Sequence, residues 1–381
     1  MRRPKMLVMR GPRESCLAFY SKFKRFDITY VTASNSSFTP KVPNLSKNIK
    51  PLTLGYRPAW WIDPVYFIQK RITNLSWANV SGVDELVRDS DVINISDTYY
   101  FSDSQLAGLA KKYNKKLVII IWTTIPNHIS TRLPPYSWNV KKVVGDTDLF
   151  ILRNKTAYKF TDSLGINRGK TVMIYKGVDL KHFYPKKNNP DRIVKILYIG
   201  IYHESKGIKD LINAFEKIHK DRYQVELHLA GRGGLEKYIN KKSETLPIVN
   251  HGFVTYDKLG DLYRTADIFC SPSKEIKILG IKTWEEYFSY TLMEAQASGL
   301  PIVATNSGGI PEEVDSRNFL VGPGDVDDLY NSLKKLVVDK NLRKKLSVIN
   351  RRRAEKMFNS EMQAEKTEEA IIRTFNLDKL R

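Results

Sequence analysis

The stretch YIGIYHESKGIKDLINAF, residues 198–215, decides the fold class of this chain. An apolar run ends at Gly200, a short polar loop carries Lys206, and the apolar positions that follow recur with helical spacing. This is the order of a strand, a loop and a helix. In a sheet of parallel strands, such a loop lies at the carboxyl ends of the strands, where ligands bind. The stretch therefore predicts an α/β unit with a lysine beside the helix N-terminus, a position suited to a phosphate.

Short apolar runs rich in β-branched residues recur on both sides of this stretch, separated by segments of helix length. Runs that are apolar on both faces are typical of buried parallel strands. Two such sets in series predict two doubly wound, Rossmann-like α/β domains. The predicted strands are 5–9, 27–31, 92–95, 117–122, 149–152 and 172–175 in the first set, and 195–199, 225–230, 248–249, 268–271, 302–304 and 319–321 in the second.

The segment 185–190 is polar, bounded by prolines and without apolar periodicity, so it is predicted to link the two domains. We expect a first domain over residues 1–183 and a second over 184–357. The charged tail has apolar positions at helical spacing, which predicts a C-terminal helical segment over 358–381 that packs back on the first domain.

Composition excludes several classes of protein. Two cysteines, Cys16 and Cys270, are too few for a disulfide framework and indicate a reducing, intracellular location. The N-terminal apolar run is interrupted at Arg10, too early for a signal peptide. The run 117–122 is far shorter than the ~20 residues of a membrane span. The six histidines show no metal-ligand spacing, so we expect neither a metal nor another cofactor.

The net charge of +21 is concentrated in the first half, where residues 1–185 hold 29 Lys and Arg against 13 Asp and Glu. Such an excess attracts polyanions of any kind. Aromatic residues lie beside lysines and arginines in 19–25, 56–71 and 136–142, which suits the headgroup region of an anionic membrane. Alternatively, these rings pack in the core while the cations are solvated. No nucleic-acid-binding signature is present, so no nucleic-acid partner is expected.

A second segment, EYFSYTLMEAQASGLP, residues 286–301, carries two glutamates with seven residues between them. Helix-forming residues from Tyr290 to Ala297 place Glu294 inside a helix and Glu286 in the loop before it. The amides of the first helical turn would face an anion, with one carboxylate on each side to accept hydrogen bonds from hydroxyl groups. This layout suits a nucleoside diphosphate sugar.

Two turns and a junction complete the pattern: the sequence NHGFV at 250–254, the glycine-rich turn at 304–312 and the junction at 175–185. Together and in this order, the segments resemble the C-terminal half of the retaining glycosyltransferases of family 4. The resemblance is specific over about residues 172–325. It implies the GT-B fold, in which two Rossmann-like domains face a central cleft, and transfer of a sugar with retention of the anomeric configuration and without a metal.

The resemblance also implies roles for individual residues. Glu286 contacts the transferred sugar and Lys206 the diphosphate, and these are the predicted catalytic residues. Glu294 binds the ribose, and the backbone near Phe253 and Val254 holds the base. The other predicted donor-binding residues are Phe288, Ser289, Tyr290 and Thr291, whose amides contact the diphosphate and sugar, and Gly11, which lets a phosphate approach closely.

The chain departs from the family pattern at several positions. Ile201 stands where the family has an arginine, and the histidines that the family has in its N-terminal domain are missing. Stabilisation of the leaving diphosphate would then depend on Lys206, the helix dipole, or a basic residue from elsewhere such as Arg10. A long insertion, residues 273–285, precedes Glu286 and either shapes the sugar pocket or forms only a surface loop.

The sequence therefore predicts a glycosyltransferase that moves a sugar from a UDP- or GDP-sugar to a lipid or oligosaccharide acceptor. We expect it in the cytoplasm, peripheral at the inner face of an anionic membrane. Two alternatives stay open: a catalytically reduced GT-B protein that binds polyanions as a regulatory module, and another sugar-nucleotide enzyme such as an epimerase. The presence of Lys206, Glu286 and Glu294 favours an enzyme.

Overall fold

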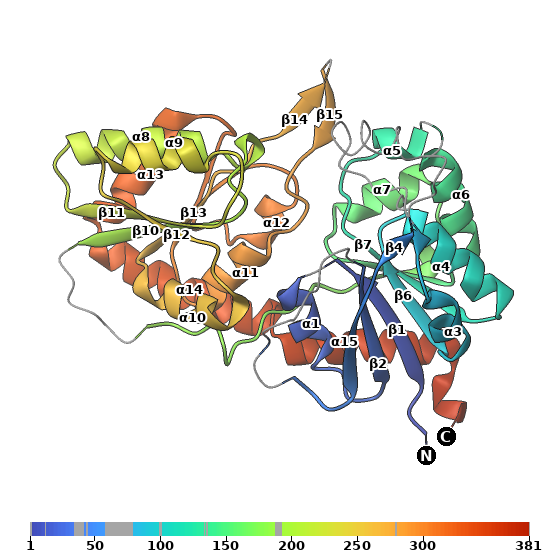
Figure 1. The fold of residues 1–381 in the computed structure, drawn as a ribbon. Helices are drawn as coiled ribbons and strands as arrows, with labels where there is room; N and C mark the ends of the chain where they lie inside the picture. The colour runs from blue at the N-terminus through green and yellow to red at the C-terminus, as the bar shows by residue number, and fades with distance from the viewer. Residues whose placement is uncertain are drawn as a thin grey trace. The chain divides into compact units, whose positions relative to one another are not determined.

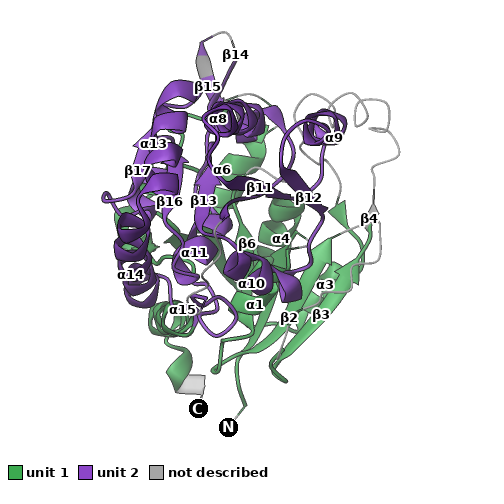
Figure 2. Ribbon diagram, turned by 90° about the vertical axis from the view of Figure 1, so that its left-hand side faces the viewer, with its two compact units in different colours: residues 1–176, 361–381 green, residues 177–360 purple. Residues whose placement is uncertain are grey.

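The computed structural model describes residues 2–11, 13–33, 42, 45–57, 79–98, 101–132, 134, 136–186, 193–278 and 280–380. The chain divides into two compact units (Figure 2). Unit 1 comprises residues 1–176 and 361–381, and unit 2 comprises residues 177–360. The chain thus leaves unit 1 at Lys176 and returns to it after Ser360.

Unit 1 is built on a seven-stranded sheet of parallel strands in the order β3-β2-β1-β6-β7-β8-β9. Helices follow most strands, and the last long helix of the chain, α15, also belongs to this unit after its first residue (Figures 1 and 2). The strands are β1 (Lys5–Arg10), β2 (Asp27–Ala33), β3 (Ile49–Leu54), β6 (Val92–Ser96), β7 (Lys116–Ile121), β8 (Leu149–Leu152) and β9 (Thr171–Met173). The helices are α1 (Glu14–Tyr20), α3 (Val83–Arg88), α4 (Phe101–Lys112), α5 (Ile129–Arg132), α6 (Tyr136–Asp146), α7 (Ala157–Ser163) and α15 (Ser360–Phe375).

Unit 2 has a six-stranded sheet, also parallel, in the order β12-β11-β10-β13-β16-β17. Its strands are β10 (Val194–Ile199), β11 (Val225–Ala230), β12 (Ile248–Gly252), β13 (Ile268–Ser271), β16 (Ile302–Thr305) and β17 (Phe319–Val321). Its helices are α8 (Ile208–Lys220), α9 (Glu236–Ser243), α10 (Tyr256–Thr265), α11 (Tyr290–Ala297), α12 (Ile310–Glu313), α13 (Val326–Val338) and α14 (Lys340–Met357). An apolar cluster that includes Leu211 of α8 and Leu333 of α13 covers one face of this sheet.

All twelve predicted strands are present, with ends that differ by up to three residues. The structure adds edge strand β3, where Lys50 and Pro51 are exposed, so the segment lacks the apolar signal of a buried strand. It also adds two short antiparallel pairs, β4 (Tyr56–Arg57) with β5 (Asn79–Val80), and β14 (Ile276–Ile278) with β15 (Ile281–Trp284). The second pair lies inside the insertion before Glu286.

The three aromatic and basic segments differ in the structure. In 19–25, Phe19 and Phe23 are only 1% exposed, so here the rings pack in the core. In 136–142, Tyr136 is buried whereas Trp138 is 65% exposed on α6. Most of the third segment, from residue 58 to 71, lies outside the described residues. Among the residues that the structure describes, no helix combines the length and apolarity needed to span a bilayer.

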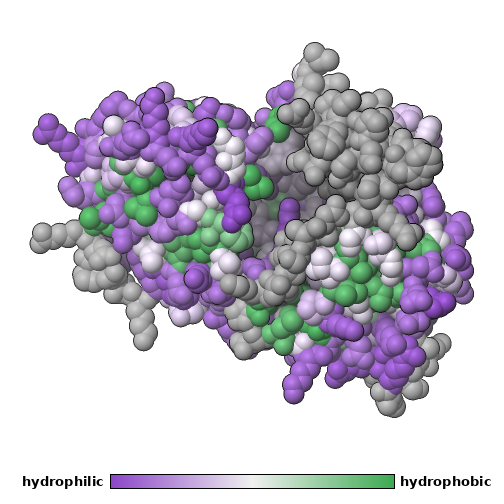
Figure 3. Space-filling model, in the orientation of Figure 1, coloured by the Kyte–Doolittle hydropathy of each residue, from purple (hydrophilic) through white to green (hydrophobic). Residues whose placement is uncertain are grey.

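The visible surface of unit 2 is largely hydrophilic, with small apolar groups between the polar residues (Figure 3). The most exposed large apolar side chains of this unit include Ile201 at 61% and Phe253 at 58%. Ile201 follows β10 and Phe253 follows β12, so both lie just beyond the carboxyl ends of strands in one sheet.

Candidate functional site

The loop that carries Lys206 is fixed by a close backbone contact. Lys206 ends a short 3₁₀ helix, Glu204–Lys206, between β10 and α8. Gly207 follows with a φ of +66°, and a Cβ atom there would lie 1.8 Å from the carbonyl oxygen of Pro272. Only glycine fits this position, because both the backbone conformation and the space exclude a side chain. The loop after β10 therefore lies directly against the residue that follows β13.

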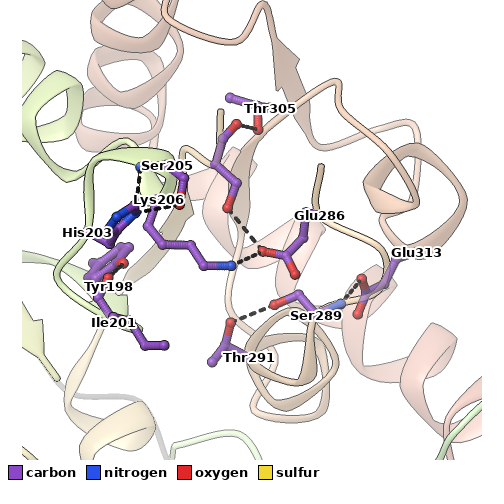
Figure 4. A network of polar contacts seen from close by, with 11 residues as sticks. Tyr198, Ile201, His203, Ser205, Lys206, Glu286, Ser289, Thr291, Thr305 and Glu313 are labelled. Atoms are coloured by element: carbon purple, nitrogen blue, oxygen red, sulfur yellow. Dashed lines mark hydrogen bonds and ion pairs between the residues drawn. The ribbon is translucent and has the colours of Figure 1, made fainter. Parts of the chain in front are cut away.

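The structure brings the two predicted catalytic residues together (Figure 4). Lys206 Nζ lies 2.6 Å from Glu286 Oε2, and the two side chains are only 22% and 15% exposed. Ser273 Oγ donates a second hydrogen bond, of 3.2 Å, to the same carboxylate oxygen. Ser273 is itself fixed, because its carbonyl oxygen accepts a 2.6 Å hydrogen bond from Thr305 Oγ1 on β16. A partly buried ammonium and carboxylate thus neutralise each other at the carboxyl edge of the sheet.

The glycine-rich turn 304–312 holds the backbone of Glu286. The amide of Gly309 donates a 2.8 Å hydrogen bond to the carbonyl oxygen of Glu286. A Cβ atom at Gly309 would lie 1.9 Å from the carbonyl oxygen of Tyr287, and one at Gly308 would lie 2.1 Å from that of Glu286. The two glycines therefore allow the turn to pack directly against the loop that positions the carboxylate.

Ser289, the residue before α11, makes a contact that the sequence analysis missed. Its amide donates a 2.8 Å hydrogen bond to Oε2 of Glu313, and its hydroxyl lies 2.8 Å from that of Thr291 (Figure 4). Glu313 is fully buried, and loss of hydration raises the pKa of its carboxyl well above the usual range. The Ser289 amide is thus engaged inside the protein, while its predicted contact with the donor stays a prediction. Helix α11 begins at Tyr290, so the amides of its first turn, which have no acceptor within the helix, begin there.

Glu294 lies inside α11, as predicted, and is only 4% exposed. Its Oε2 accepts a 2.9 Å hydrogen bond from the hydroxyl of Tyr263 on α10. Burial and the neighbouring Glu294 carboxylate raise the pKa of this phenol well above its usual range, so Tyr263 stays a donor. Motif spacing did not predict the contact with Tyr263, because this residue is 31 positions away along the chain and belongs to another helix.

The predicted base-binding residues follow β12. Phe253 is exposed, and the guanidinium carbon of Arg232 lies 4.4 Å from its ring centroid. Phe288 differs, because its side chain is 5% exposed and packs edge-on against Phe358, with ring centroids 5.9 Å apart. Phe288 therefore offers a ligand its backbone, whereas Phe253 also offers an aromatic face.

In unit 1, Gly11 follows β1, and a Cβ atom there would meet nothing within 4 Å. Its neighbour Arg10 is 8% exposed and is held inside the unit. The guanidinium donates to the side-chain and main-chain oxygens of Asn94 and, over 2.7 Å, to the hydroxyl of Tyr20. Arg10 is thus engaged within unit 1. Within the described ranges, no group of three or more acidic, cysteine or histidine side chains is arranged to hold a metal ion.

Comparison with known proteins gives one family match, over residues 181–353, to the glycosyl transferases group 1 model. The chain is 25% identical over 267 residues to the sulfoquinovosyl transferase SQD2 of Arabidopsis thaliana, a match that covers 64% of this chain and 50% of that protein. It is 26% identical over 266 residues to the capsular polysaccharide biosynthesis glycosyltransferase CapM of Staphylococcus aureus, covering 68% and 66% of the two chains. The chain thus spans about half the length of SQD2.

Two solved structures show the same fold over nearly the whole chain. The sucrose-phosphate synthase of Thermosynechococcus elongatus superposes with a TM-score of 0.73 at 17% identity, covering 98% of this chain and 100% of that one. HepE of Anabaena, solved in complex with UDP and glucose, superposes with a TM-score of 0.70 at 16% identity, covering 97% and 99%. At such identities the likeness concerns the fold, and it confirms the predicted class of two doubly wound α/β domains.

Proposed function

We propose that this chain, which matches the glycosyl transferases group 1 model over residues 181–353 and has the GT-B fold, transfers a sugar from a nucleoside diphosphate sugar. The donor is a UDP- or GDP-sugar, and the acceptor is a lipid-linked sugar or an oligosaccharide. The anomeric configuration is retained. The observation that carries this proposal is the Lys206–Glu286 pair, which lies in one network with the loop that leads into α11.

Donor binding would exchange the partners of this pair. The diphosphate brings negative charge to Lys206, whose ammonium then turns from the Glu286 carboxylate to the phosphate oxygens. Glu286 is thereby released to accept hydrogen bonds from hydroxyl groups of the sugar. On α11, the first-turn amides and the helix dipole add to the stabilisation of the diphosphate. Because Ile201 supplies no charge, Lys206 carries most of this stabilisation.

In the proposed reaction, the bond from the anomeric carbon to the diphosphate breaks, and a bond from that carbon to an acceptor oxygen forms on the same face of the sugar. The acceptor's proton passes to the departing phosphate oxygen, so no side-chain base is required. Glu294, oriented by Tyr263, binds the ribose hydroxyls and so fixes the position of the nucleotide. Catalysis then derives mainly from electrostatic stabilisation of the leaving diphosphate.

The basic half of the chain suggests how an acceptor is reached. Trp138, Lys141 and Lys142 are all exposed on α6 of unit 1. An exposed indole beside two ammonium groups suits the headgroup region of an anionic bilayer. We therefore propose that unit 1 binds the cytoplasmic surface of an anionic membrane peripherally and meets a lipid-linked acceptor there.

Two steps test the proposed function. Thermal-shift screening of the full chain against nucleoside diphosphates and their sugars should show stabilisation by one base and one sugar. Mass spectrometry of reactions with that donor and lipid or glycan extracts should then show an acceptor heavier by one sugar residue. An isomeric nucleotide sugar as the only product would instead indicate an epimerase. Donor binding with neither transfer nor hydrolysis would indicate a binding module.

A further inference from the structure

The insertion before Glu286 folds as an antiparallel hairpin. Strand β14, Ile276–Ile278, pairs with β15, Ile281–Trp284, and Trp284 lies opposite Ile276 (Figure 1). Only Glu285 separates the end of this hairpin from Glu286. The hairpin projects from the body of unit 2, but its base continues directly into the candidate site.

Ion pairs fix the base of the hairpin. Lys282 Nζ lies 2.6 Å from Glu275 Oε1 and 2.8 Å from Glu285 Oε2, so it joins the residue before β14 to the residue after β15. Lys274 Nζ lies 2.7 Å from Asp210 Oδ2 on α8. The Lys274 amide also donates a 2.7 Å hydrogen bond to the carbonyl oxygen of Ser205. The hairpin is therefore attached to the same loop and helix that position Lys206.

Trp284 contacts Lys206, one member of the proposed catalytic pair. Its ring centroid lies 4.4 Å from Lys206 Nζ, within the range of a cation–π contact, while the same ammonium binds Glu286 over 2.6 Å. The indole and the carboxylate thus contact the same ammonium group. When Lys206 turns toward a diphosphate, its ammonium leaves the indole face of Trp284. That face then becomes accessible to the sugar, which is bonded to the diphosphate.

We propose that Trp284, at the base of the hairpin, forms a wall of the pocket for the transferred sugar. A pyranose ring presents C–H groups on its faces and hydroxyls around its rim. The indole face contacts the C–H groups, and Glu286 accepts hydrogen bonds from rim hydroxyls. This inference rests on the proposed function of the same site, and it adds a sugar-binding residue to it.

The test compares a nucleotide sugar with the nucleoside diphosphate that lacks the sugar. Calorimetry is performed on the full chain and on the variants Trp284→Ala and Trp284→Phe. The matched control is Lys277→Ala, since Lys277 lies on the same hairpin with a side chain that is 58% exposed. We expect Trp284→Ala to weaken binding of the nucleotide sugar about tenfold, or ~1.4 kcal/mol, and binding of the diphosphate less than twofold. Trp284→Phe and Lys277→Ala should keep most of the affinity.

Fluorescence gives a second readout, because Trp284 is the single tryptophan in residues 177–360. In a chain whose other tryptophans are replaced by phenylalanine, emission should change more with the nucleotide sugar than with the diphosphate. Equal losses for both ligands in Trp284→Ala would overturn the inference, because they would show that Trp284 acts only through Lys206. Unchanged affinity for both would also overturn it, with the proposed function intact. If the wild-type chain binds no nucleotide sugar at all, the proposed function fails and the inference fails with it.

Discussion

If a diphosphate replaces Glu286 as the partner of Lys206, removing the charge of Lys206 and removing that of Glu286 should have opposite effects on the affinity for a nucleoside diphosphate. Replacing Lys206 by Ala removes the ammonium that would bind the diphosphate, whereas replacing Glu286 by Gln removes the carboxylate that competes for it. In the structure the two groups are 2.6 Å apart with side chains 22% and 15% exposed, so the pair is only partly screened by water. On the proposed function, a nucleoside diphosphate displaces Glu286 from Lys206 as it binds.

The magnitudes follow from this geometry. A hydrogen bond to a charged group contributes about 1.5–3 kcal/mol, so Lys206→Ala should weaken nucleoside diphosphate binding by about 10- to 100-fold. Loss of one electrostatic stabiliser of a leaving group should also lower kcat by about 10²–10³. Glu286→Gln should leave nucleoside diphosphate binding unchanged or tighten it by up to about tenfold, since the competing charge is gone.

Calorimetry with UDP and GDP measures both effects at low salt. The control is Lys217→Ala, because Lys217 pairs with Asp327 on the surface and its side chain is 47% exposed. The free energy of unfolding should fall by about 1–3 kcal/mol in Lys206→Ala, because the partly buried Glu286 carboxylate loses its cation but keeps the hydrogen bond from Ser273. Diphosphate affinity that is unchanged in Lys206→Ala, or that falls in Glu286→Gln as far as it does in Lys206→Ala, would refute the reasoning.

Three further predictions concern other residues. Glu313→Gln should raise the free energy of unfolding, measured in urea, more at pH 8 than at pH 5. The pKa of this buried carboxyl is higher in the folded chain than in the unfolded chain, so the wild type loses stability as the pH rises between these two pKa values. A difference between variant and wild type that does not depend on pH would contradict this. Tyr263→Phe should weaken nucleotide binding by about tenfold, because Glu294 loses the hydrogen bond that orients it toward the ribose. The loss should be smaller for a 2′,3′-dideoxy nucleotide, and equal losses for both nucleotides would exclude a ribose contact. Trp138→Ala should reduce sedimentation with anionic liposomes at low salt, and equal wild-type binding to neutral liposomes would argue against a membrane surface.

The fold was predictable where burial leaves a strong pattern. Strands β7 and β10 are apolar and lie in the interior of their sheets, so their sequences stand out. Strand β3 was missed because Lys50 and Pro51 face solvent at a sheet edge. The hairpin of residues 276–284 was recognised only as an insertion, since its two strands are short and its role depends on a contact with Lys206.

The candidate site shows the same limit. Motif spacing placed Lys206 before a helix and Glu294 inside one, and both positions agree with the structure. Spacing does not report which side chains meet, so the ion pair between residues 80 positions apart was not foreseen. Nor was the bond from the Ser289 amide to Glu313, because an acidic residue in the first turn of a short helix has the pattern of a solvated group. Both contacts join residues that are far apart along the chain, so motif spacing does not predict them.

Transfer by the wild type and by Glu286→Ala tests the central claim most directly. The full chain is incubated with the nucleotide sugar that stabilises it, carrying an isotopic label in the sugar, and with the acceptor found by mass spectrometry. We predict that the wild type moves the label to the acceptor, whereas Glu286→Ala still folds and binds the nucleoside diphosphate but transfers at least about 100-fold more slowly. Undiminished transfer by Glu286→Ala would contradict the account.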